Sequence, residues 1–246
     1  MSEFKFPTEE IDLPSKGLLY PKDSPLASGK IEMKYMTAKE EDILTNPNYL
    51  AKGIVIDKLL QALIISKVNY NDLVLGDQNA IMIASRILGY GKDYEFSYGG
   101  YSQKVDLTTL EDKEFDETLI TPHTNEFTFT LPHSKIELTF KVLTVGDGVK
   151  MRKELEGLKK LNKEASPEMS TKLKHMITAV NGDRGPGTVR SFVDTALLAR
   201  DARALREYVA KVQPDINLTV EVETSNGTED ITLPITSNFF WPDSTT

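Results

Sequence analysis

The chain has 246 residues, long enough for one large domain or two smaller ones. Its 37 Asp and Glu outnumber its 29 Lys and Arg, and repulsion from phosphate by the net charge of -8 disfavours a general nucleic-acid or anionic-membrane binder. With no cysteine and only three histidines, the chain has no disulfides, Cys-ligated zinc, iron–sulfur clusters or thiol nucleophiles.

The N-terminal segment is not typical of an export signal. Its first 21 residues have acids where a signal needs a basic region, and they lack a continuous apolar core. The most apolar stretch, 53–65, is interrupted by Asp57, Lys58 and Gln61 and is shorter than the roughly 20 residues of a membrane span. We therefore expect an intracellular, soluble product without membrane insertion.

Prolines at near-regular intervals predict that residues 1–28 form an extended arm rather than a helix, because proline fixes the backbone and removes a donor. An extended arm has no core of its own, so its apolar side chains are expected to lie on the rest of the chain or on a partner. These side chains are Phe4, Phe6, Leu13, Leu18, Leu19 and Tyr20.

A strand, helices and a hairpin are predicted after the arm. The strand spans Lys30–Met36, and a short helix then begins at Thr37 with a capping box to Glu40. An apolar helix from about 52 to 65 and another from about 71 to 88 follow. Alternating residues around a Gly-Gly turn then indicate a hairpin.

The second half of the sequence repeats the order of the first, which predicts an internal duplication. Gly29–Thr37 (GKIEMKYMT) resembles Ser134–Thr144 (SKIELTFKVLT). Each segment follows a Leu-Pro pair and ends in a threonine that is expected to cap a helix. Further along, the helix that contains Asp77 aligns with the helix that contains Asp201.

The alignment extends to two hairpins, 95–107 and 221–233, so we predict an α+β fold of two tandem related units. Each unit has an N-terminal extended arm and strand, a helical segment and a terminal β-hairpin. The predicted division is a proline-rich arm at 1–28, a first α+β repeat at 29–118 and a second α+β repeat at 119–246 with a C-terminal FFWP block.

No catalytic, cofactor-binding or metal-binding set is predicted, so we expect that the chain is not an enzyme. His123, His133 and His175 have no spacing that brings two of them to one metal, and His175 is expected to be solvated. The glycine-rich segment 181–188 lacks the Gly-Lys-Ser/Thr ending of a phosphate loop and is predicted to be a turn before a helix. Acid pairs such as Glu40-Glu41 are interpreted as helix-start charges.

Two features are open to a structural or a partner-binding interpretation. A basic series in the second half, which includes Arg200, Arg203 and Arg206, is either a salt-bridged surface or a docking surface for an acidic partner. The C-terminal aromatic block either closes the second hairpin as part of the core or inserts into a partner. The candidate partner-binding residues are Phe4, Phe6, Leu18, Leu19, Tyr20, Arg200, Arg203, Phe239, Phe240 and Trp241.

Four segments carry a resemblance that spans nearly the whole chain. They are LPSKGLLYP (Leu13–Pro21), GKIEMKYMTAKEEDIL (Gly29–Leu44), RILGYGKDYEF (Arg86–Phe96) and LPITSNFFWP (Leu233–Pro242). Together they resemble the baseplate hub and hub-assembly proteins of contractile-tailed bacteriophages of the T-even type. The first and last segments are fairly specific, and the middle is generic.

The resemblance implies a non-enzymatic structural or assembly protein of the phage tail baseplate hub, which binds other hub proteins during tail assembly. It implies a location in the host cytoplasm during assembly and then in the tail baseplate of the virion. A homo-oligomer stays open, and two alternatives remain. One is an assembly chaperone that is absent from the mature virion, and the less favoured one is a virion-associated cell-wall hydrolase.

The resemblance also bears on metal, because relatives often carry CxxC pairs in both hairpins and form zinc-ribbon-like knuckles. Here Tyr98-Gly-Gly-Tyr101 and Thr224-Ser-Asn-Gly227 stand near those places, so we expect knuckles without zinc. Packing by the two tyrosines is expected to replace the metal in the first hairpin. The second hairpin is expected to have an ordinary turn.

Overall fold

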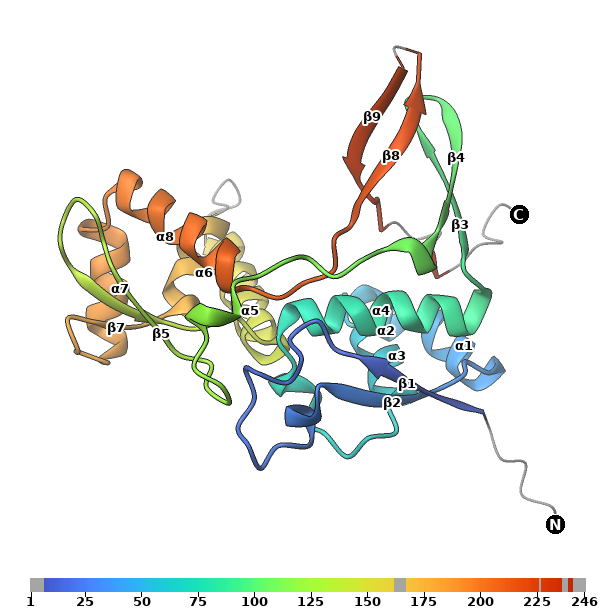
Figure 1. Ribbon diagram of the computed structural model, residues 1–246, viewed down its shortest axis with the longest axis horizontal. Helices are drawn as coiled ribbons and strands as arrows, with labels where there is room; N and C mark the ends of the chain where they lie inside the picture. The colour runs from blue at the N-terminus through green and yellow to red at the C-terminus, as the bar shows by residue number, and fades with distance from the viewer. Residues whose placement is uncertain (1–6, 162–166, 226, 236–238, 241–246) are drawn as a thin grey trace.

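The structure is a computed structural model that describes residues 7–161, 167–225, 227–235 and 239–240. Its described part has the predicted α+β class, with helices alternating with small antiparallel sheets. Figure 1 shows helices α5–α8 gathered at one end of the molecule, and the two hairpins standing together at the other end above α4. One apolar cluster includes buried residues from both halves of the chain, from Leu13 to Phe240.

The first half places a long helix between a small sheet and a hairpin. The sheet pairs β1 with β2, and the hairpin pairs β3 with β4, both antiparallel. In chain order the elements are β1 (Thr8–Asp12), β2 (Lys30–Lys34), α1 (Ala38–Leu44), α2 (Pro47–Ala51), α3 (Val55–Leu63), α4 (Leu75–Tyr90), β3 (Asp93–Tyr98) and β4 (Tyr101–Asp106).

The second half has longer helices around a three-stranded sheet of order β5-β6-β7, and it ends in its own hairpin. Its sheet is antiparallel throughout. In chain order the elements are β5 (Phe127–Thr130), β6 (Glu137–Phe140), α5 (Val145–Leu161), α6 (Glu168–Met176), β7 (Ile177–Val180), α7 (Pro186–Thr195), α8 (Ala199–Val212), β8 (Thr219–Thr224) and β9 (Gly227–Thr232).

The described part of the arm lies on the first half of the chain and also contacts His123 of the second. Residues 8–12 pair with β2, and Leu13, Leu19 and Tyr20 are buried. Apolar burial of this kind is what holds an extended segment in place. The expectation that the arm's apolar side chains lie on the rest of the chain is therefore confirmed for these three residues.

The helices of the first half differ from the prediction at their boundaries. The apolar helix expected from about 52 to 65 is α3, which begins only at Val55 because Gly53 before it takes a positive φ of 61°. A separate short helix that was not predicted, α2, precedes it and is capped by Asn46. The next helix begins at Leu75, after a 3-10 turn at Tyr70–Asp72.

Equivalent turns are held in the same way in the two halves. After Leu13-Pro14, the Ser15 amide donates to Asp77 Oδ1 at 2.9 Å. After Leu131-Pro132, the His133 amide donates to Asp201 Oδ1 at 2.9 Å and the Ser134 amide to Oδ2 at 3.0 Å. Each aspartate is fully buried in the first turn of a helix, α4 or α8.

A second contact set recurs at the start of α1 and α5. Glu40 accepts from the Thr37 amide at 3.1 Å and lies 2.8 Å from Lys34 Nζ, which confirms the predicted capping box. In the second half, Asp147 accepts from the Thr144 amide at 3.1 Å and lies 2.7 Å from Lys141 Nζ. The tandem duplication stays a prediction, to which these matching contacts add structural support.

The two hairpins pack against each other instead of standing apart. Gln103 of β4 joins them, because its side chain donates to the Glu223 carbonyl at 2.8 Å and accepts from the Glu223 amide at 3.2 Å. The Tyr98 side chain reaches Glu229 of β9 through a hydrogen bond. Tyr101 is 47% exposed, so the expectation that both tyrosines pack together in place of a metal is wrong for Tyr101.

The described end of the chain returns to the first half. Phe239 meets Tyr94 of β3 edge to face at 5.0 Å between ring centroids, and Phe240 meets Phe239 in the same way. The Tyr94 hydroxyl donates to the Pro234 carbonyl at 2.8 Å. Phe239 and Phe240 are 0% and 1% exposed, so they belong to the core, where they join the second hairpin to the first rather than closing the second alone.

Candidate functional site

The three histidines lie in three separate environments. His123 Nδ1 is 3.2 Å from the Tyr20 carbonyl, and His133 is at the turn held by Asp201. His175 Nε2 is 2.8 Å from Glu154 Oε2, and its side chain is 16% exposed, so the expectation that it is solvated is wrong. Within the residues that the structure describes, no group of three or more acidic or histidine side chains is placed to hold a metal ion.

Glu154 is the centre of a polar cluster that connects three helices. Arg190 of α7 donates to both of its oxygens, at 3.1 and 3.2 Å, and His175 of α6 approaches the same carboxylate of α5. Burial acts to raise the pKa of Glu154, but His175 and Arg190 hold it below its ordinary value. Because both carboxylate oxygens are engaged by neighbouring helices, we assign this cluster a structural role.

Asp77 has the most perturbed carboxyl environment among the described acids with a printed pKa value. Burial raises its pKa to about 6, although hydrogen bonds from Tyr20 and Ser15 oppose the rise. The Tyr20 and Ser15 hydroxyls and the Ser15 amide all donate to it. The Val74 amide in turn donates to the Tyr20 hydroxyl at 3.0 Å. A carboxyl group enclosed in this way anchors the LPSKGLLYP segment to α4.

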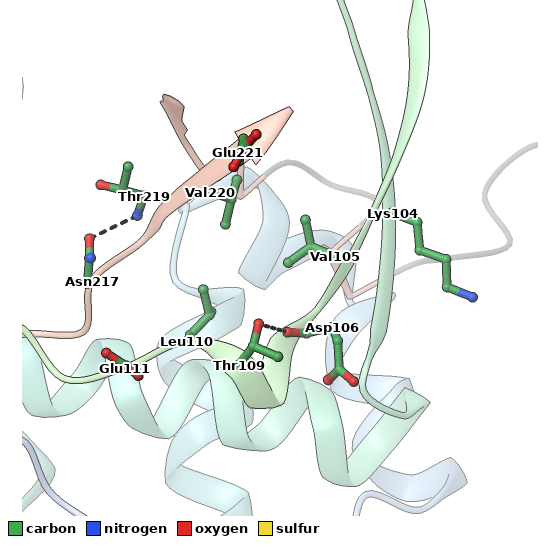
Figure 2. A pocket seen from close by; sticks show the side chains of 10 residues that line it. All are labelled: Lys104, Val105, Asp106, Thr109, Leu110, Glu111, Asn217, Thr219, Val220 and Glu221. Carbon is green, nitrogen blue, oxygen red and sulfur yellow. Dashed lines mark hydrogen bonds between the residues drawn. The ribbon is translucent and has the colours of Figure 1, made fainter. Parts of the chain in front are cut away.

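A cleft of about 390 Å³ lies where β4 and the segment after it face the start of β8 (Figure 2). Two of its charged side chains are already paired. Lys104 lies 2.9 Å from Asp93, and Asp106 lies 2.6 Å from Lys92. Hydrogen bonds from Lys92 and Thr108 lower the pKa of Asp106 to about 2.

The other two acids of this cleft come from opposite walls. Figure 2 shows Glu111 on the segment that follows β4 and Glu221 on β8. The backbones of the two walls are joined beside the cleft, because the Asn217 amide donates to the Glu111 carbonyl at 2.8 Å. Paired carboxylates catalyse when they converge on one bond, and this arrangement gives no such convergence, so we assign the cleft no chemistry.

The helices of the second half form a basic region on an acidic protein. Together α5–α8 contain twelve Lys and Arg against seven Asp and Glu, a net charge of +5, so the rest of the chain carries -13. Part of the positive charge is paired locally, since Arg152 of α5 pairs with Asp57 of α3 and Arg203 pairs with Glu207 within α8. Arg200 is exposed and makes no ion pair with any residue that the structure describes.

Most of the other candidate partner-binding residues have structural positions. Leu19 and Tyr20 are buried, as are Phe239 and Phe240, so the partner-binding interpretation of these four side chains is corrected to a core role. Leu18 is half-buried, and its carbonyl accepts from the His123 amide at 2.6 Å. Phe4, Phe6 and Trp241 lie outside the described residues.

An apolar groove of about 510 Å³, which we call the methionine groove, lies between α5, α6 and α8. Three of the seven methionines of the chain line it: Met151, Met169 and Met176. This surface is not among the predicted partner-binding residues, although the i, i+4 spacing of Met151 and Leu155 and of Met169 and Leu173 is a signal for an apolar helix face. Leu173 and Val209 form part of its buried floor.

No protein-family model, curated protein or solved structure matches the chain. Within the described part of the chain, no helix is long and apolar enough to cross a membrane.

The edges of the methionine groove carry positive charge. Lys113 comes from the segment after the first hairpin, Lys172 from α6 and Arg206 from α8, with Glu168 as the acid among the lining residues. Arg206 Nη1 lies 3.2 Å from Met169 Sδ, so the basic edge and the apolar surface are in direct contact. The groove therefore combines adaptable apolar side chains with basic flanks, a combination suited to protein binding.

Proposed function

We propose that this chain is a non-enzymatic structural or assembly protein of a phage tail baseplate hub, which binds other hub proteins during tail assembly. The resemblance of its arm and C-terminal segments to that family suggests the setting. The binding role is carried by one observation, the concentration of net charge +5 in α5–α8 of a chain whose total is -8. Its site of action is the host cytoplasm during assembly and then the virion tail baseplate.

Charge separation of this kind favours association with complementary surfaces. A basic face attracts acidic partners and raises the rate of encounter, and the effect weakens as salt screens the charges. The acidic remainder of the chain repels the same partners and so fixes which end of the molecule they approach. These properties support a connecting protein that binds through its second-half helices.

Several residues of the segments that carry the resemblance have structural roles within this chain. Ser15 and Tyr20 hold the arm to Asp77, Thr37 and Glu40 cap α1, and Phe239 packs in the core. Since these motif residues maintain the fold, the exposed cations of α5–α8 are better candidates for binding than they are.

Co-expression with candidate hub proteins, followed by size-exclusion chromatography of the full chain, tests the proposal. We expect co-elution with at least one hub protein, and weaker co-elution as the salt is raised from about 0.1 M to about 0.5 M. The variant Arg200→Glu/Arg203→Glu should reduce it. Lys22→Glu/Lys39→Glu is the matched control, because it changes the net charge equally at exposed lysines outside α5–α8. Absence of co-elution with every hub protein would contradict the proposal.

Two measurements separate the alternatives. Mass spectrometry of purified particles should detect the chain if it is a structural protein of the virion, whereas an assembly chaperone should be missing. A peptidoglycan-release assay on the purified chain should give no activity, and measurable release would favour the cell-wall hydrolase instead.

A further inference from the structure

The methionine groove has a floor that is buried and an edge that is not. Leu173, Met176 and Val209 are 3–5% exposed and belong to the main apolar cluster of the chain. Met169, in contrast, is 58% exposed. The groove is therefore an outward continuation of the core, open to solvent between three helices.

Methionine is well suited to a surface that receives another chain. Its unbranched side chain has three rotatable bonds and a polarizable sulfur, so a methionine surface adapts to the shape of an incoming apolar residue. The volume of about 510 Å³ lies within the roughly 300–1,000 Å³ of ligand-binding clefts, which is room for several side chains from one helix face.

The charges around the groove indicate that the partner surface is negatively charged. Lys113, Lys172 and Arg206 make no ion pair with any residue in the described part of the chain. Cations elsewhere on the second-half helices are paired, since Lys174 of α6 lies 2.7 Å from Asp194 and Arg190 of α7 lies 3.1 Å from Glu154. Three cations from three separate segments thus flank one apolar groove, where they can pair with acidic side chains of a partner.

We propose that the methionine groove binds an acidic amphipathic helix of a partner protein. Apolar side chains at positions i, i+3 or i+4 and i+7 of that helix enter between α5, α6 and α8. Asp or Glu on its flanks pair with Lys113, Lys172 and Arg206. Identifying the partner as a hub protein rests on the proposed function, whereas the chemistry of the groove does not.

A designed peptide tests the chemistry directly on the full-length protein. The probe is a fluorescent helix of about 18 residues with a leucine stripe and Glu on both flanks, and its matched control has Lys in place of every Glu. Fluorescence anisotropy should show about ten-fold or tighter binding of the acidic peptide, because like charges oppose the basic one. Equal binding of the two peptides would overturn the proposal.

Substitutions in the groove locate the binding. Met169→Asp places a charge at an exposed edge position, and Lys172→Glu/Arg206→Glu reverses two flanking charges, so neither removes a buried side chain. Each should weaken acidic-peptide binding about ten-fold or more. The control Lys22→Glu/Lys39→Glu should change it less than about two-fold. An equal loss in the control would mean general charge attraction and would contradict a groove site.

The same variants separate this inference from the proposed function. If the wild-type chain co-elutes with a hub protein and Met169→Asp co-elutes equally well, the groove is not the site, although the function stands. If the wild-type chain binds the acidic peptide through the groove but no hub protein, the function fails and the groove assignment stands. A dimer in light scattering that Met169→Asp dissociates would show a second copy in the groove and would overturn the partner assigned here.

Discussion

The two halves of the molecule each hold a turn with a buried aspartate, but the groups that donate to the aspartate differ. Asp77 and Asp201 both sit in the first turn of a helix, and both hold a turn that follows a Leu-Pro pair. Asp77 accepts hydrogen bonds from two hydroxyls and one amide, and burial raises its pKa to about 6. For Asp201 burial acts in the same direction, but hydrogen bonds from His133 and Ser134 outweigh it and lower the pKa.

The difference lies in the balance between burial and hydrogen bonds, because the donors lower the pKa of both carboxyl groups but outweigh burial only at Asp201. Two backbone amides donate to Asp201 and favour its ionised form, because an amide hydrogen bond stabilises negative charge. The Tyr20 hydroxyl at Asp77 is itself deeply buried and resists ionisation, since burial raises its pKa. The same contact thus gives the first half a carboxyl that titrates near neutrality and the second half one that stays ionised.

Function is better sought where the halves diverge. The turn and capping contacts recur, and they are structural. The helices differ, because α5–α8 are longer as a group and carry net charge +5, whereas α1–α4 contain three Lys and Arg against five Asp and Glu. The methionine groove likewise belongs to the second half, apart from the flanking Lys113.

The largest effect should come from breaking the contact that joins the halves at the hairpins. Phe239→Ala removes a fully buried ring that meets Tyr94 and Phe240, so we expect a loss of about 3–5 kcal/mol in the free energy of unfolding. Urea unfolding measures it. Leu161→Ala, at a side chain that is 86% exposed, is the control and should change little. Equal small effects would mean that the aromatic block is not a core element.

Replacing the two aspartates tests their equivalence. Asp77→Ala leaves the Ser15 amide and two hydroxyls without their acceptor in the core, for which we expect a loss of about 3 kcal/mol. Asp201→Ala leaves two backbone amides and should cost less, because fewer buried donors lose their partner. Thermal and urea unfolding of the pair measure this order, and a larger loss for Asp201→Ala would reverse our ranking.

Stability should depend on pH through Asp77. In the unfolded chain the carboxyl releases its proton near its ordinary value of 3.8, whereas the folded chain holds it to about 6. Because the folded state binds more protons in this window, this contribution to stability is present below about pH 4 and lost as the pH rises towards 6.

The variant Asp77→Asn isolates that contribution, since asparagine does not titrate. Its stability relative to the wild type should rise by about 2–3 kcal/mol between pH 4 and pH 7. Urea unfolding across this range, with Asp42→Asn as an exposed control, measures the difference curve. A flat difference between wild type and Asp77→Asn would mean that the folded pKa is not raised.

Local features of the fold were predictable because their signals lie within a few residues. The capping box needs only Thr37 and Glu40, three residues apart. The first hairpin turn needs only Gly99 and Gly100, which take φ values of 58° and 85° between the paired Tyr98 and Tyr101. The size and apolar character of Phe239 left both a core and a partner-binding role open, and its burial against Tyr94 decides for the core.

Long-range features were not predictable, because they depend on which elements meet. Phe239 packs on Tyr94, which lies far from it in the sequence, and no local pattern specifies that partner. His175 was expected to be solvated because it lies beside Lys172 and Lys174 in the sequence, but the fold places it against Glu154 of α5. The methionine groove is formed by three helices and a lysine that is distant in the sequence. The i, i+4 apolar spacing of each helix therefore did not show that these helices meet at one groove.

The smallest expected effects are those at the helix caps. They test the comparison of the two halves most directly, because the capping acid has the same kinds of partner at both sites. Glu40→Ala and Asp147→Ala each remove an acceptor for a threonine amide and a partner for a lysine, at the start of α1 and α5. We expect each to lower the free energy of unfolding by about 1–2 kcal/mol.

The matched controls are Asp42→Ala and Glu156→Ala, which remove exposed acids from the same two helices without a cap contact. Near-equal losses for Glu40→Ala and Asp147→Ala, with little change in the controls, would extend the equivalence of the halves from geometry to energetics. A loss confined to one cap would instead restrict the equivalence to backbone placement. That outcome would weaken the predicted duplication, since related units should retain the energetic role of a shared contact as well as its position.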